Sequence, residues 1–107
     1  MSPRPPGRHE LPEIDEAALA AARWADRLLA AARDRGSTRW EAFLAPLPDR
    51  LRDAPPGELR AAARRGRAAF GAKDSIVDVV PWEDALAFRD AIDRLLKLLA
   101  RREAAEG

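Results

Sequence analysis

The sequence contains no cysteine and no tyrosine, and it has a single histidine among its 107 residues. Without cysteine, the chain can form no disulfide, thiolate metal site or cysteine nucleophile. The histidine, His9, lies in a proline-rich stretch that is expected to be unstructured, whereas a ligand or base needs partners that are held in place nearby. We therefore expect His9 to have neither a catalytic nor a metal-binding role.

Long apolar runs are also missing. The start, MSPRPPGRHELPE, lacks the apolar core of a signal peptide. No later segment approaches the roughly 20 apolar residues that a membrane-spanning helix needs. We expect a cytoplasmic protein with no membrane partner.

Apolar β-branched residues are scarce and gather only near Ile76 to Val80, whereas alanine is abundant and leucine supplies most of the bulk. This composition favours helix over strand. A chain of this length is expected to form one domain with one modest core. The composition predicts an all-α fold.

The chain divides near residue 12. Residues 1–12 hold four prolines among charged residues, a composition that predicts a flexible arm. From Glu13 to Arg35, apolar residues recur on one arc of a helix, and Gly36 is placed to end that helix in a left-handed conformation. Residues 13–104 are therefore predicted to form a single helical domain.

Two shorter helices are expected in the middle of the chain. The pair Thr38 and Glu41 has the spacing of a capping box, which predicts a helix start that runs to about Ala45. A further turn is expected over residues 48–53, with Leu47 and Leu51 directed inward. The next helix is predicted from about Glu58 to Phe70.

The end of the chain has one ambiguous segment and one long helix. Residues 73–80, KDSIVDVV, fit either a single turn capped by Ser75 or a strand that pairs with another chain, and we favour the turn. Pro81 is expected to open a final helix that runs to Ala104. The predicted fold is a small bundle of about four helices, with long first and last helices and two shorter ones between them.

The sequence carries no recognisable catalytic constellation. Neighbouring acids occur, as in Glu83 and Asp84, but helix ends and ion pairs explain them without a metal, and no Glu-x-x-His motif accompanies them. The stretch from Gly66 to Ser75 has glycine, lysine and serine at the wrong spacing for a phosphate-binding loop. We expect no cofactor and no enzymatic activity, although a site assembled between two copies would escape this reasoning.

The most unusual stretch is GELRAAARRGRAAFGAK, which has four arginines in eight residues. The whole chain has a net charge of +1, and residues 60–73 carry five positive charges and no acid, so the rest of the chain carries −4. Arginines three or four apart lie one above another on a helix, here over about 10 Å. The candidate binding residues are Arg60, Arg64, Arg65, Arg67 and Lys73.

Three interpretations of this row stay open: a solvated helix face, a surface for an acidic protein partner, or a phosphate-binding surface for nucleic acid. No aromatic residue is expected on this face to stack on bases. Acidic residues of the first or last helix, in the same molecule or a second copy, are candidate neighbours of the arginines. Our leading hypothesis is a non-catalytic helical interaction or oligomerisation module, and the alternative is a small nucleic-acid-binding subunit without sequence readout.

Three large apolar residues of the last helix are not obviously used by the core: Trp82, Leu86 and Leu98. Other segments of the chain can cover them, or they can contact a second copy. Because small domains with modest cores often gain stability by association, we expect a homo-oligomer that uses these residues as contacts.

Overall fold

The computed structural model describes residues 5–71 and 75–106, and within them the chain forms five α-helices and three single 3-10 turns. No strand occurs in this part of the chain. The predicted all-α bundle with long first and last helices is therefore confirmed. In order, the elements are η1 (Arg8–Glu10), α1 (Pro12–Asp34), α2 (Thr38–Leu44), α3 (Leu47–Asp53), α4 (Pro56–Arg67), η2 (Ala68–Phe70), η3 (Ile76–Asp78) and α5 (Trp82–Glu106).

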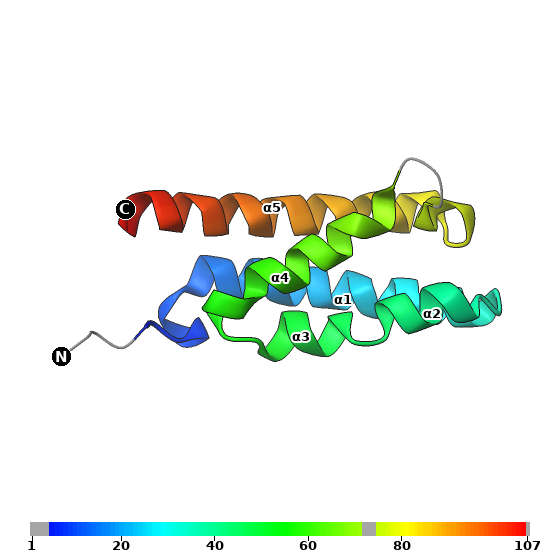
Figure 1. The fold of residues 1–107 in the computed structure, drawn as a ribbon, viewed down its shortest axis with the longest axis horizontal. Coiled ribbons are helices and arrows are strands. Elements are labelled where there is room, and N and C mark those ends of the chain that lie inside the picture. Colours follow the sequence, from blue (N-terminus) through cyan, green and yellow to red (C-terminus); the bar gives the residue numbers. More distant parts are fainter. Residues whose placement is uncertain (1–4, 72–74, 107) are drawn as a thin grey trace.

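The two long helices set the shape of the molecule. α1 and α5 run antiparallel along its long axis, α2 and α3 return along α1, and α4 crosses obliquely from the end of α3 to α5 (Figure 1). The molecule is elongated, with extents of 51 × 22 × 19 Å. The C-terminal end of α5 projects beyond the adjacent ends of α3 and α4 (Figure 1).

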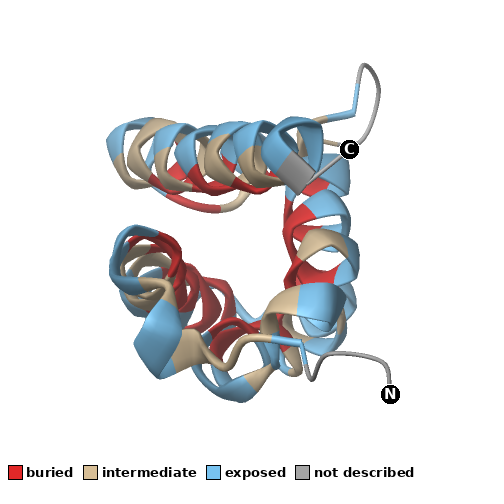
Figure 2. Ribbon diagram, turned by 90° about the vertical axis from the view of Figure 1, so that its left-hand side faces the viewer, coloured by how far each residue is buried: buried red, intermediate tan, exposed pale blue. Residues whose placement is uncertain are grey.

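The core lies between the inner faces of the helices, where the buried residues of all five α-helices face one another (Figure 2). The inner face of α1 is mostly alanine, and small side chains let neighbouring helices approach closely. Larger side chains of the other helices, among them Leu44, Phe88 and Leu95, fill the space around it and are fully buried. Leu47 and Leu51 are fully buried on α3, as expected.

Local sequence signals set most of the helix ends. Gly36 adopts a φ of 70° after α1, as predicted, a conformation that costs glycine little. Ser75 accepts a hydrogen bond from the Val77 amide, and this bond caps the predicted turn η3. The predicted capping box at the start of α2 is wrong by one residue, because the amide of Trp40 donates to the hydroxyl of Ser37 rather than to that of Thr38.

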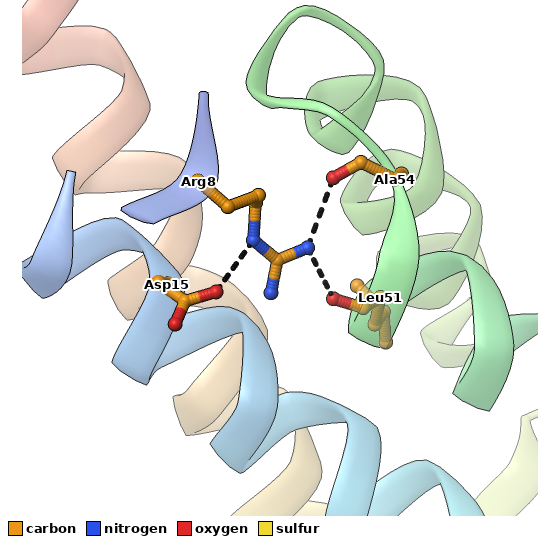
Figure 3. A network of polar contacts seen from close by, with 4 residues as sticks. All are labelled: Arg8, Asp15, Leu51 and Ala54. Atoms are coloured by element: carbon orange, nitrogen blue, oxygen red, sulfur yellow. Dashed lines mark hydrogen bonds and ion pairs between the residues drawn. The ribbon is translucent and has the colours of Figure 1, made fainter. Parts of the chain in front are cut away.

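The start of the chain differs from the flexible arm that we expected over residues 1–12. Residues 1–4 lie outside the described part of the chain, but Arg8 is docked on the bundle (Figure 3). Its Nε donates to Asp15 Oδ1 at 2.8 Å, and its Nη1 donates to the carbonyl oxygens of Leu51 and Ala54 at 3.0 and 2.9 Å. The arginine thus caps the C-terminal end of α3, where carbonyl groups lack partners within the helix.

Candidate functional site

The candidate site is built on α4, whose inner face is fixed by packing. Pro56 occupies the first turn of α4, where its missing amide hydrogen costs nothing. Leu59, Ala62, Ala63 and Gly66 are buried on the inner face. The α-helix ends at Arg67, and the 3-10 turn η2 continues the chain to Phe70, the predicted end.

The outer side of α4 carries Arg60, Arg64, Arg65 and Arg67, which we call the arginine face. Two of these arginines bind acids of α5: Arg60 Nη1 lies 2.6 Å from Glu103 Oε1, and Arg67 Nε lies 3.1 Å from Asp93 Oδ1. The prediction that acids of the last helix neighbour these arginines is confirmed. The positive charges of Arg60 and Arg67 are therefore partly neutralised within the molecule.

Two of the arginines lie against aromatic rings, although no aromatic residue was expected on this side of the molecule. The Arg65 guanidinium lies 4.6 Å from the ring centroid of Phe43, and its Nη2 donates to the Phe43 carbonyl at 3.4 Å. The Arg67 guanidinium lies 5.7 Å from the ring centroid of Phe70. Phe43 belongs to α2, so only the fold brings it to α4. These cation–π contacts restrain the guanidinium groups and cover one face of each ring.

Arg64 differs from the other three arginines. It is exposed, it follows Arg60 by one helical turn, and its side chain makes no hydrogen bond, ion pair or ring contact with any described residue. Its positive charge is consequently not compensated within that part of the molecule. Lys73, the fifth predicted binding residue, lies outside the described residues.

The three apolar residues expected at an oligomer contact do not form one surface. Trp82 is 61% exposed at the start of α5 and Leu86 is partly buried. Leu98 is also partly buried and packs against the core. Leu98 follows Trp82 by 16 positions, which corresponds to about 24 Å along the helix. Any contact through Leu98 is thus separate from a contact through Trp82.

The described residues offer little support for a catalytic site, a metal site or a membrane span. His9 is exposed, and its Nε2 lies 3.4 Å from Glu10 Oε1. Nowhere in residues 5–71 and 75–106 do three histidine, aspartate or glutamate side chains come together as a metal site would require. The described helices are all too short or too polar to cross a membrane.

Comparisons with models of protein families, with curated proteins and with solved structures found no match. No relative therefore indicates a function for the arginine face, and its chemistry has to be inferred from its own residues.

Proposed function

We propose that this protein is a non-catalytic interaction module that binds an acidic segment of a partner protein through the arginine face of α4. The observation that carries this proposal is the position of Arg64, which is exposed and lacks a counter-ion among the described residues. It lies between Arg60 and Arg67, which already bind carboxylates. The arginine face therefore has the geometry to hold carboxylates, and neither Arg64 nor Arg65 pairs with one among the described residues.

The two ion pairs to α5 do not block this surface. Side chains of Arg67 and Asp93 are 43% and 49% exposed, and ion pairs this exposed contribute at most about 1 kcal/mol. A partner's carboxylates can thus replace Asp93 or Glu103 at little cost. The Arg65 side chain loses less conformational entropy when a partner binds, because the ring of Phe43 already restrains it.

A nucleic-acid partner is the alternative, and one feature favours a protein over it. Arg65 and Arg67 cover one face each of Phe43 and Phe70. Stacking of bases, which supplies much of the affinity for single strands, is consequently restricted there.

The proposal is tested by measuring the binding of a fluorescent oligoglutamate peptide and of a single-stranded oligonucleotide at several salt concentrations. We expect the peptide to bind the native protein more tightly than the oligonucleotide does. Arg64→Glu should weaken peptide binding by about tenfold, or about 1.4 kcal/mol. Arg23→Glu makes the same charge change at an exposed position on α1 and should have little effect.

Two results would contradict the proposal. Equal loss of peptide affinity in Arg64→Glu and Arg23→Glu would show attraction by overall charge alone. Tighter binding of the oligonucleotide, with a steep loss of affinity as salt rises and a strong effect of Arg64→Glu, would assign the arginine face to nucleic acid.

A further inference from the structure

A groove of about 580 Å³ lies at the end of the molecule where α1 begins and α5 ends, and we call it the end groove. Its apolar lining includes Leu11, Ile14 and Leu98. Leu98 is one of the residues for which the sequence predicted an oligomer contact. The groove lies far from Trp82, at the opposite end of α5, so a partner in the groove need not contact Trp82.

Opposite charges line the two sides of the end groove. Glu10 precedes α1, Glu13 lies in its first turn, and Arg101 comes from the last turns of α5. Glu13 and Arg101 are both exposed, and neither side chain forms an ion pair or hydrogen bond with any described residue. An acid and a base that border one groove without pairing across it leave room for an inserted element with the complementary charges.

The acidic side of the groove is held in place. Arg8 binds Asp15 on one side and the carbonyl groups of Leu51 and Ala54 on the other, so the segment that carries Glu10 and Leu11 is fixed to both α1 and α3 (Figure 3). The groove is therefore preformed, and a partner does not have to order this segment on binding.

The end of α5 has the shape and charge that the groove requires. It projects beyond α3 and α4 (Figure 1), it carries Arg101, and its exposed residues Ala104 and Ala105 make it narrow. An isologous dimer makes each contact twice, so residues that occupy a groove and residues that line it belong to the same surface. The end groove meets this requirement, because one side carries Glu13 and the other side carries Arg101.

We propose that the end groove binds a second copy of this chain. The ends of two α5 helices lie antiparallel around a twofold axis, and each enters the groove of the other copy. Arg101 of one copy pairs with Glu13 of the other, and the Leu98 side chains of both copies contribute to the apolar centre. This inference goes beyond the proposed function, because it does not involve α4 and holds even if the arginine face binds nothing.

The dimer is tested by sedimentation equilibrium on three charge-reversal samples. Glu13→Arg alone and Arg101→Glu alone each place like charges at both contacts, and we expect each reversal to weaken the dimer by about a hundredfold, about tenfold per contact. In a heterodimer of the two variants, the Glu13→Arg side chain of one copy meets the Arg101→Glu side chain of the other with opposite charge, and one native Arg101–Glu13 contact is kept. The mixture should therefore recover a mass of twice 11.8 kDa at a concentration where each variant alone sediments at 11.8 kDa.

Controls separate this interface from other surfaces. Arg64→Glu and Trp82→Ala should leave the dimer unchanged, and far-UV circular dichroism should show the same helix content in every variant. Failure of α4 to bind peptide would not affect this result, so the two proposals fail independently.

The inference is overturned if the native protein sediments at 11.8 kDa, if both charge reversals leave the dimer intact, or if the mixture fails to recover it. A monomer whose groove binds a small amphiphile, which a groove of this volume can accommodate, would also overturn it.

Discussion

Gly66 of α4 lies directly against the ring of Phe88 on α5. A β-carbon built on Gly66 would come within 3.0 Å of Phe88 Cζ and 3.2 Å of Ile92 Cδ1. Phe88 and Ile92 are fully buried and have little room to move. The inner side of α4 is therefore held at close range by α5, and this contact keeps the arginine face on the outer side.

Replacement of this glycine should destabilise the protein. Alanine gains up to about 1 kcal/mol of helix propensity over glycine, whereas overpacking of a core costs about 1–3 kcal/mol. We expect Gly66→Ala to lower the free energy of unfolding by about 1 kcal/mol, measured by chemical denaturation. In contrast, Gly57→Ala should be neutral or stabilising, because no atom lies within 4 Å of a β-carbon built there. A stabilised Gly66→Ala variant would show that α4 and α5 pack more loosely than described.

The docked Arg8 should contribute to stability although it precedes the first long helix. Its side chain is 13% exposed and makes three hydrogen bonds. Loss of these charged bonds leaves two carbonyl groups at the end of α3 without this donor, so Arg8→Ala should cost about 2 kcal/mol in urea unfolding. The exposed pair Arg33–Glu41 provides the matched comparison, and Arg33→Ala should cost less than about 1 kcal/mol. Equal effects of the two substitutions would mean that the start of the chain is not docked in solution.

The ion pair between Arg67 and Asp93 should matter more for binding than for stability. Asp93→Asn removes the carboxylate from a half-exposed pair, so the free energy of unfolding should change by less than about 1 kcal/mol. The released Arg67 becomes available to a partner, and the affinity for oligoglutamate should rise a few-fold. Unchanged or weaker peptide binding would indicate that Arg67 takes no part in the interaction surface.

Two tryptophans should respond very differently to truncation. Trp40 is 7% exposed within the core, and Trp82 is 61% exposed at the start of α5. Trp40→Ala should cost about 3–5 kcal/mol of stability, as truncation of a buried aromatic does, and Trp82→Ala should cost less than about 0.5 kcal/mol. A large loss of stability in Trp82→Ala at low protein concentration would show that the ring packs within the same chain.

Most of the fold follows from signals that act over one or two turns of helix. Gly36 ends α1 because only a residue without a β-carbon easily adopts its left-handed conformation, and Ser75 caps η3 through an amide two residues away. The start of α2 was predicted one residue late because Ser37 and Thr38 are both good caps. Backbone geometry, which the sequence does not display, selects Ser37.

The contacts that shape the candidate sites are long-range, and the sequence gives little indication of them. Arg8 is separated from Leu51 and Ala54 by 43 and 46 residues, and its position among prolines suggested disorder rather than docking. Arg65 meets Phe43 across 22 residues, so the aromatic ring near the arginine face could not be assigned from helix periodicity. The arginine row itself was visible because its residues lie on consecutive turns of one helix.

Amide chemical-shift mapping tests, without any substitution, whether an acidic partner binds the outer side of α4. Oligoglutamate added to ¹⁵N-labelled protein should shift the amides of residues 60–67 and those around Phe43, and it should leave the amides near the end groove unchanged. Shifts that spread evenly over all exposed arginines, or that avoid residues 60–67, would contradict the claim.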